Sequence, residues 1–479
     1  MSAAEIRAAT LEAVLQPDQA SESRVVLDPR DPLAIARRVL AERFAHEASG
    51  WPLLRSWRGD LRGWTGTHYP VVEDAGVRAA LYEYLECAHR PAKGDTTEPF
   101  RPTAAAVNNV LDALRAAAHL DGSVPMPSWL EAGARREHPH QLLACRNGLL
   151  DLQSRKLLPH TPGFFCGHAL PYDYVAAGPE PAEWLEFLYS LWPHDPEAAE
   201  TLQEIFGYVL SGETRQQKLF LLVGPKRSGK GTIARVLRAL LGEVNVAGPT
   251  LSALATNFGL QSLIDRPLAI VSDARLSGRA DQAVIVERLL SVSGEDVLTV
   301  DRKHREPWIG QLPTRILVLT NELPRLADTS GALASRFLVL TLTNSWYGHE
   351  DVRLFDRLLP ELPGILRWAL DGLDRLRARG HFRAPQSSTQ AVEELEDLAS
   401  PVGAFLRECC DVEPGAEIEM AAVYARWRRW CDERGREHPG TEQTFGRDLR
   451  AAIPAIGRGD RRASGERFRV YVGLRLKGA

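Results

Sequence analysis

The segment LFLLVGPKRSGKGTIARVLRALL, residues 219–241, governs the interpretation of the whole chain. Its first five residues are apolar and predict a buried parallel strand, and a glycine-bearing turn follows. After Lys230 the apolar residues recur at helical spacing. A strand, such a turn and a helix start cradle phosphate, because loop N–H groups and the helix dipole both favour negative charge. The segment therefore predicts a phosphate-binding loop in which Lys230 reaches the outer phosphates.

The turn follows the Walker A pattern, which has a glycine, four residues, then Gly-Lys and a serine or threonine. Gly224, Gly229 and Lys230 fit, but Gly231 stands where the hydroxyl is expected, and Thr232 supplies it one residue later. The same Gly-Lys-Gly-Thr ending occurs in loops of the adenylate-kinase type, so we expect a phosphate cradle with Thr232 as a candidate magnesium ligand. The predicted nucleotide-binding residues are Gly224, Pro225, Lys226, Arg227, Ser228, Gly229, Lys230, Gly231 and Thr232.

A second apolar run, Leu268–Val271, ends at Ser272 and Asp273. An acid at the carboxyl end of a parallel strand beside a phosphate loop is the Walker B arrangement, which holds magnesium and positions the attacking water. Many such enzymes carry two adjacent acids, whereas this chain has Asp273 alone at the strand end. The alternative is that Asp273 caps the next helix. We predict that Asp273 handles the metal or the water.

Composition limits the class of protein. A length of 479 residues predicts about three domains, and 44% hydrophobic with 25% charged residues is ordinary for a soluble globular protein. A net charge of −4 excludes a uniformly basic protein but permits local basic faces. The six cysteines form no Cys-x-x-Cys pair, which argues against zinc and for a reduced cytoplasmic compartment. No apolar run reaches the ~18 residues that span a bilayer, so no membrane partner is expected.

The N-terminal part is expected to be mostly helical. The run from Trp57 to Tyr69, with Gly63 and Gly66, predicts a hairpin whose aromatics and nearby arginines could bind nucleic acid. A small hydrophobic cluster with solvated arginines is the favoured alternative. Further on, Asn147-Gly148 predicts a second hairpin whose return strand begins at Asp151.

Three further motifs follow the second strand. They are Ser293-Gly294-Glu295-Asp296 with Asp301-Arg302-Lys303, the strand RILVLTNELP with Asn321 at its end, and Ser335-Arg336-Phe337. With the phosphate loop, they resemble the superfamily 3 helicases of the AAA+ class, specifically the phage and plasmid primase–helicase family. The resemblance runs from about residue 50 to the C-terminus and is densest over residues 219–342.

The resemblance implies a role for each motif. Lys303 and His304 would lie at the tip of a hairpin in a central channel, on DNA phosphate. Asn321 would be the sensor that contacts the γ-phosphate or orients water. Arg336 would be an arginine finger on the neighbouring subunit's ATP, where a guanidinium stabilises charge spread over three oxygens. The alternatives are a solvated charged turn for Lys303 and His304, a turn residue for Asn321 and a surface ion pair for Arg336.

The C-terminal tail is locally basic. From Arg426 onward it carries 14 Lys and Arg against seven Asp and Glu, a net of +7. TEQTFGRDLRAAI predicts a helix, and RRASGERFRVYVGLRLK predicts a hairpin, together a winged helix. A solvated basic surface is the alternative. Tyr424, Trp427 and Trp430 recur at helical spacing, which favours a buried stripe. The predicted phosphate contacts are Arg447, Arg450, Arg461 and Arg462.

We therefore expect an α/β protein in three parts: a mostly helical α+β domain of poxvirus type over residues 1–200, a P-loop AAA+ ATPase core with a parallel sheet over 201–384, and a winged helix over 385–479. The predicted function is an ATP-dependent DNA helicase that acts in replication of a phage, plasmid or integrated mobile element. The expected cofactors are ATP and Mg²⁺. The predicted catalytic residues are Lys230, Asp273, Asn321 and Arg336.

The expected partners are single-stranded and forked DNA and further copies of the chain, which would form a hexameric ring. A separate primase or replication initiator is a further partner that this interpretation allows, because no primase catalytic region is recognisable ahead of the helical domain. Two other functions stay open. One is a nucleotide kinase, suggested by Gly-Lys-Gly-Thr. The other is a non-enzymatic DNA-binding replication protein with a degenerate ATPase, suggested by the single Walker B acid.

Overall fold

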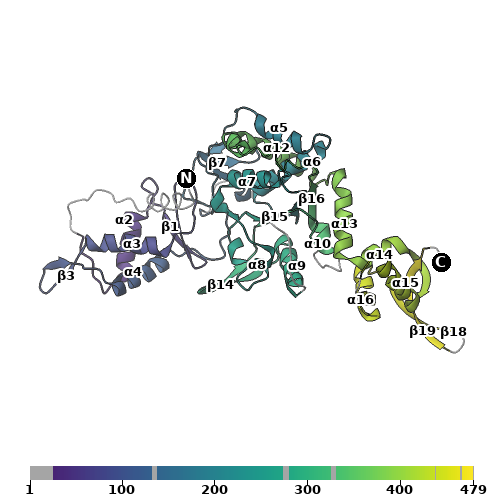
Figure 1. The fold of residues 1–479 in the computed structure, drawn as a ribbon. Helices are drawn as coiled ribbons and strands as arrows, with labels where there is room; N and C mark the ends of the chain where they lie inside the picture. Colours follow the sequence, from purple (N-terminus) through teal and green to yellow (C-terminus); the bar gives the residue numbers. More distant parts are fainter. Residues whose placement is uncertain are drawn as a thin grey trace.

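The structure is a computed structural model that describes residues 25–131, 137–272, 280–324, 331–436, 439–463 and 466–477. The described chain forms three parts in sequence order. A central parallel sheet with its helices lies between the N-terminal helices on one side and the C-terminal unit on the other (Figure 1). Among the described helices, none combines the length and the apolar character needed to cross a bilayer.

Five strands form the central sheet in the order β11-β12-β15-β10-β16, and every neighbouring pair is parallel. The α/β class with a parallel sheet is therefore confirmed. The strand predicted at the start of the phosphate loop and the strand predicted to end before Asp273 both belong to this sheet. Its strands are β10 (Leu219–Val223), β11 (Val246–Ala247), β12 (Leu268–Val271), β15 (Arg315–Thr320) and β16 (Phe337–Thr341).

Alternate residues of these strands enter two separate cores, because successive side chains of a strand point to opposite faces. Phe220 and Leu222 of β10 belong to one buried cluster, and Leu219 and Leu221 belong to the other. The first face is covered by α5 (Ala182–Leu191), α6 (Pro196–Ser211), α7 (Lys230–Leu241) and α12 (Leu362–Arg379). The second face is covered by α8 (Leu251–Leu254), α9 (Ala280–Ser293), α10 (Ala332–Arg336) and α13 (Thr389–Ala399).

Short elements connect these layers. A two-stranded antiparallel hairpin precedes β15, and a short helix follows β16. These are β13 (Leu298–Arg302), β14 (Arg305–Gly310) and α11 (Leu354–Leu358), with 3₁₀ turns η1 (Pro139–Gln141), η2 (Glu243–Asn245), η3 (Gln261–Leu263), η4 (Leu359–Glu361) and η5 (Gln386–Ser388).

Three helices and small hairpins build the N-terminal unit. Asp31 and Thr103 cap two of the helices by accepting hydrogen bonds from Ala34 N at 2.9 Å and Ala106 N at 3.2 Å. Apolar residues from all three helices fill one core. The elements are α2 (Pro32–Arg43), β1 (Leu54–Trp57), β2 (Asp60–Gly63), α3 (Asp74–Glu86), β3 (His89–Pro91), β4 (Thr97–Pro99) and α4 (Ala104–Ala117).

The first hairpin lies earlier than we predicted. Its turn is Arg58-Gly59, both at positive φ (48° and 80°), so β1 pairs with β2 over residues 54–63. The later residues Trp64 and Tyr69 instead join Trp57 and Phe165 in a buried aromatic cluster. The hydrophobic-cluster interpretation of these aromatics is therefore confirmed, but its expectation of solvated arginines is wrong, because Arg62 is buried and Arg55 and Arg58 are half-buried.

Small antiparallel sheets link the N-terminal unit to the core. The hairpin at Asn147-Gly148 is confirmed, but its return strand begins at Gly148, which pairs with Cys145, and not at Asp151. Leu143 and Leu150 of this hairpin are buried in the same cluster as α6 and α7. The strands are β5 (Ser128–Trp129), β6 (Leu142–Cys145), β7 (Gly148–Asp151), β8 (Leu157–Leu158) and β9 (Phe164–Phe165).

Helices lie across or beside both divisions that we expected between the parts, and the divisions themselves stay predictions. Helix α6 runs without a break through residue 200 and packs wholly within the core. Helix α13 starts after residue 384, yet its Ala391 and Leu395 are buried against the central sheet. Helix α13 therefore contributes to the second core of the central sheet.

The C-terminal unit is a helix, a strand, two helices and two strands around a three-stranded antiparallel sheet of order β17-β19-β18. Trp427 and Trp430 are buried and stack on each other, with ring centroids 5.3 Å apart, so the predicted buried stripe is confirmed for these two residues, and Tyr424 packs half-buried against the same cluster. The elements are α14 (Pro401–Cys409), β17 (Cys410–Glu419), α15 (Met420–Glu433), α16 (Glu442–Ala452), β18 (Gly457–Ala463) and β19 (Glu466–Leu476).

Two glycines allow α6 and α12 to approach closely. A Cβ atom at Gly207 would lie 2.3 Å from the carbonyl oxygen of Ala369, and one at Gly372 would lie 2.5 Å from the carbonyl carbon of Gln203. Both obstacles are backbone atoms, which cannot rotate away. The contact between the helices therefore requires glycine on each side.

We predict that Gly207→Ala lowers the free energy of unfolding by about 1–3 kcal/mol, because overpacking outweighs the ~1 kcal/mol that alanine gains over glycine in a helix. The midpoint of urea denaturation, followed by tryptophan fluorescence, measures the loss. Gly248→Ala is the matched control, since a Cβ there meets no atom within 4 Å. Equal midpoints for the two variants would contradict the close approach of the helices.

Candidate nucleotide-binding site

The predicted phosphate loop lies between β10 and α7, as the sequence indicated. Two of its glycines are sterically required. A Cβ at Gly224 would lie 2.4 Å from the carbonyl oxygen of Leu342, and Gly229 has φ of 92° with a Cβ position 2.7 Å from Leu191. These packing contacts fix the start and the end of the loop against neighbouring elements. The loop shape is therefore set by the surrounding fold as well as by its own residues.

Lys230 is buried at the first turn of α7, and its ammonium lies inside the loop. The Nζ atom donates to the carbonyl oxygens of Gly224 at 2.5 Å and Pro225 at 2.7 Å, and to Ser228 Oγ at 3.1 Å. Burial lowers the pKa of Lys230. An ammonium in a ring of oxygen acceptors is directed at the centre of the loop, where an anion would gain most from it.

Asn321 lies beside this lysine. It follows directly after β15, whose Thr320 pairs with Val223 at the end of β10, so the two strands end together. Asn321 Oδ1 accepts a hydrogen bond from Lys230 Nζ at 3.3 Å. The structure thus brings together two of the four predicted catalytic residues. Their catalytic roles stay predictions.

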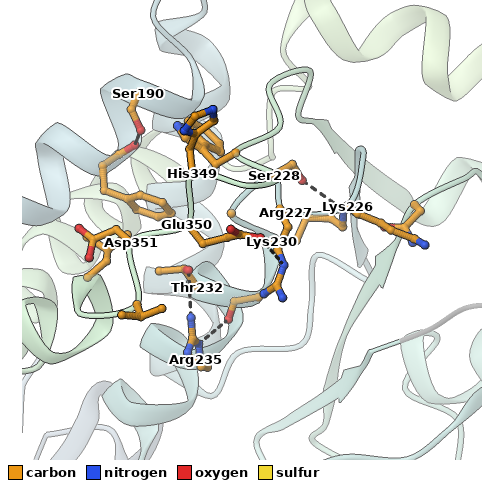
Figure 2. A pocket seen from close by; sticks show the side chains of 17 residues that line it. Ser190, Lys226, Arg227, Ser228, Lys230, Thr232, Arg235, His349, Glu350 and Asp351 are labelled. Carbon is orange, nitrogen blue, oxygen red and sulfur yellow. Dashed lines mark hydrogen bonds and ion pairs between the residues drawn. The ribbon is translucent and has the colours of Figure 1, made fainter.

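A cleft of about 730 Å³ opens next to the loop, a size that suits a nucleotide. Its lining combines apolar side chains with the loop and with acidic residues from a segment that follows β16 (Figure 2). Besides loop residues 226–232, the lining consists of Phe187, Ser190, Arg235, Asn321, Trp346, His349, Glu350, Asp351, Val352 and Leu354.

The segment over residues 345–354 is a wall of the cleft that the sequence reasoning missed. Ser345 Oγ donates to the carbonyl oxygen of Lys226 at 2.8 Å, and Trp346 N donates to that of Arg227 at 3.0 Å. Arg227 also forms an ion pair with Glu350 at 3.2 Å. The backbone N–H groups of Glu350 itself and of Gly348, and the charge of Arg227, lower the pKa of Glu350. The sequence could have indicated this wall in one way. The segment follows β16, and β16 ends on the same side of the sheet as β10, where the loop begins.

Of the two predicted magnesium ligands, Thr232 lies within the cleft lining. Its Oγ1 accepts a hydrogen bond from Arg235 Nη2 at 3.3 Å, one turn along α7 (Figure 2). The role of Thr232 as a magnesium ligand stays a prediction. Asp273 lies outside the described residues, although β12 before it ends at the same edge as the loop.

Arg336 lies on the opposite side of the sheet, where the strands begin. It precedes β16, whose Phe337 pairs with Leu219 at the start of β10, whereas the loop follows the end of β10. A strand of five residues spans roughly 16 Å at about 3.3 Å per residue. Arg336 Nη1 donates to Ser293 Oγ at 3.1 Å. Within one chain, therefore, Arg336 does not meet Lys230.

Lys303 and His304 form the turn between β13 and β14, as predicted, and both are exposed. His304 has a positive φ of 58°, which makes the turn tight. The backbone N–H of Lys303 donates to Gln261 Oε1 at 3.3 Å. The predicted hairpin tip is therefore present, and its two cations face solvent.

The four predicted arginines of the C-terminal unit are exposed on two elements, Arg447 and Arg450 on α16, and Arg461 and Arg462 on β18. Arg461 pairs with Glu417 of β17, with Nε to Oε2 at 2.6 Å. Arg447 Nε also pairs with Asp448 Oδ1 at 3.1 Å, so two of the four exposed arginines are partly neutralised within the unit.

Two family descriptions match parts of the chain. The family described as D5 N terminal like matches residues 41–193, and a family of unknown function, DUF5906, matches residues 222–336. The first match runs from the end of α2 through the rest of the N-terminal unit and its link to the core, and includes α5. The second runs from the phosphate loop to Arg336.

Solved structures are similar over nearly the whole chain. The apo structure of the NrS-1 C-terminal region aligns with 93% of this chain and 99% of that one, at 10% identity and a TM-score of 0.52. The A form apo structure of the NrS-1 C-terminal region covers 92% of this chain and 100% of that one, at 12% identity and a TM-score of 0.48. The chain is thus similar in overall fold to the NrS-1 C-terminal region.

Proposed function

We propose that the protein is an ATP-dependent DNA helicase of the phage primase–helicase type, acting in replication of a phage, plasmid or integrated element. The D5 N terminal like match and the fold shared with the NrS-1 C-terminal region support this class. The observation that carries the proposal is the placement of Lys230 and Asn321 at one edge of the parallel sheet and of Arg336 at the opposite edge. Such a chain holds half of a catalytic site on each of two surfaces.

In this proposal ATP lies in the cleft beside the loop. Lys230 and the loop N–H groups hold its phosphates, and Asn321 senses the γ-phosphate or orients the attacking water. Thr232 and Asp273 would hold a magnesium ion, whose charge would neutralise the phosphate oxygens. The apolar side chains Phe187 and Val352 in the cleft lining offer contacts for the base.

Arg336 would complete the site of a neighbouring subunit, which makes a closed ring, a hexamer, the expected assembly. An arginine finger supplied by a neighbour is worth about 10³–10⁵ in rate, because it stabilises charge that develops only in the transition state. In the single chain Ser293 holds this guanidinium at the surface of the AAA+-type core.

DNA would be held by two parts of the chain. Lys303 and His304 would contact single-stranded DNA in the channel. The order of elements α14-β17-α15-α16-β18-β19 is that of a winged helix, in which α16 would be the recognition helix. Arg447 and Arg450 on α16 and Arg461 and Arg462 on the wing would contact phosphates of forked DNA.

A mixing experiment tests the shared site. We predict that Lys230→Ala and Arg336→Ala each lower ATP hydrolysis and strand displacement by about 10²-fold or more, and that a mixture partly restores hydrolysis. In a mixed assembly, some sites combine Lys230 from one variant with Arg336 from the other and are therefore complete. Arg30→Ala, in the N-terminal unit with a side chain 86% exposed, is the control. Failure of the rescue, with both variants still assembling, would exclude a shared site, and phosphoryl transfer to a nucleoside monophosphate by a monomer would identify a kinase instead.

Asn321→Ala is expected to separate binding from chemistry. We predict that kcat for ATP falls about 10²-fold while the affinity for ATP changes by less than about threefold, because the amide acts on the transition state. Steady-state hydrolysis and binding of a fluorescent ATP analogue measure the two quantities. Asn344→Ala is the matched control, since its amide donates to Ser190 O at 3.2 Å and does not line the cleft. Equal kcat values for the two variants would remove Asn321 from the mechanism.

For the C-terminal unit we predict that Arg447→Ala with Arg450→Ala weakens binding to forked DNA. The slope of log K against log salt should fall by about 0.9 for each phosphate that the variant no longer neutralises. Titrations by fluorescence anisotropy at several salt concentrations measure the slope. Arg429→Ala, an exposed arginine on α15, should leave it unchanged. A similar fall for Arg429→Ala would mean that only the overall charge of the tail matters.

A further inference from the structure

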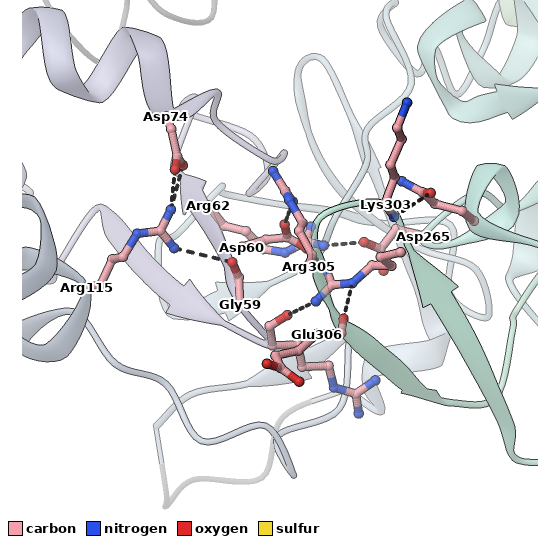
Figure 3. Close-up of polar contacts among 12 residues, drawn as sticks. Gly59, Asp60, Arg62, Asp74, Arg115, Asp265, Lys303, Arg305 and Glu306 are labelled. Atoms are coloured by element: carbon pink, nitrogen blue, oxygen red, sulfur yellow. Dashed lines mark hydrogen bonds and ion pairs between the residues drawn. The ribbon is translucent and has the colours of Figure 1, made fainter. Parts of the chain in front are cut away.

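The turn of the first N-terminal hairpin is docked against the hairpin that carries Lys303 and His304. Asp60, next to this turn, is buried and lies between two arginines that flank the hairpin tip (Figure 3). One carboxylate oxygen accepts from Arg302 Nη1 at 3.0 Å, and the other pairs with Arg305. The partners are 242 and 245 residues apart in sequence.

The two arginines differ in what they can still do. The side chain of Arg302 is 6% exposed and also donates to the carbonyl oxygens of Arg58 at 3.2 Å and Glu306 at 2.9 Å. Its hydrogen-bonding groups are therefore engaged within the protein. The side chain of Arg305 is 49% exposed while it pairs with Asp60. A planar guanidinium that is half open to solvent can bind a phosphate while it keeps its carboxylate.

Two other contacts join the first hairpin to the central part of the chain. The Arg58 guanidinium lies 5.6 Å from the ring centre of Trp308, a buried residue of β14. Arg62, itself buried, forms an ion pair with Asp265 in the loop before β12. Lys303 extends away from Asp60 (Figure 3). The N-terminal unit thus contacts the residues on either side of the hairpin turn, and the side chains of Lys303 and His304 in the turn stay exposed.

We propose that Arg305 is a third DNA-phosphate contact of this hairpin, and that Asp60 of the N-terminal unit is the positioning residue that orients it. The inference rests on the proposed DNA-binding function of the tip. The buried pair Asp60–Arg302 fixes the turn, and the second oxygen of Asp60 holds the Arg305 guanidinium beside Lys303 and His304. The N-terminal unit would thereby set how the core meets single-stranded DNA.

A double-mutant cycle in the full chain tests this. We expect Arg305→Ala to weaken binding of a fluorescein-labelled oligothymidylate several-fold, and to reduce the salt slope by about 0.7, the value for one phosphate of a single strand. Asp60→Asn should cause at least a similar loss, and the double variant should lose less affinity than the sum of the two single losses, because part of the effect of Asp60 passes through Arg305. Arg305→Lys should retain most of the affinity, since a phosphate accepts either cation.

Glu306→Gln is the matched control, because it removes one negative charge beside Arg305 while Arg302 bonds only to the backbone oxygen of this residue. It should leave DNA binding equal to or tighter than that of the unaltered chain. Asp60→Asn behaving like Glu306→Gln would overturn the positioning role, and Arg305→Ala with unchanged affinity and slope would overturn the phosphate contact. Urea midpoints check folding, and if Asp60→Asn is destabilised, the half-exposed Arg305 carries the test. An unaltered chain that binds no oligothymidylate would instead reject the proposed function itself.

Discussion

The common direction of the five central strands determines on which side of the sheet each candidate site residue lies. Strands that run parallel end at one edge, so Lys230 and Asn321 meet across 91 residues of sequence. The same rule keeps Arg336 away from them, because it precedes a strand and they follow strands. Successive residues of each strand are buried in one core or the other, and helices cover both faces of the sheet. This packing stabilises the parallel arrangement of the strands.

Local sequence patterns predicted local structure well. The strand, loop and helix over residues 219–241 lie where the apolar spacing placed them, and the turn at Lys303 and His304 is a turn. The first hairpin was misplaced because its turn uses Arg58 at positive φ, a conformation that arginine rarely signals. Asp273 stays a prediction from sequence alone.

Features that depend on distant parts of the chain could not be predicted in this way. The wall over residues 345–354 has no motif of its own and gains its place from the end of β16. The pairing of Asp60 with Arg302 joins two segments whose partners only the tertiary packing selects. A buried carboxylate needs such partners, since an unpaired charge in the interior is strongly unfavourable. The contact between the turn of the first hairpin and the β13–β14 hairpin is therefore polar and specific in direction.

Helix α6 has a practical consequence for dissecting the molecule. The core of the first sheet face includes Leu143, Leu150 and Trp184 together with α6 and α12. An expression fragment that starts at residue 201 would sever α6 and lack Leu143, Leu150 and Trp184, and the apolar side chains of α6 and α12 that these residues cover would then be exposed and favour aggregation. A fragment meant to fold as the central part would instead have to retain the small hairpin that begins at Leu142, because the two share buried apolar surface.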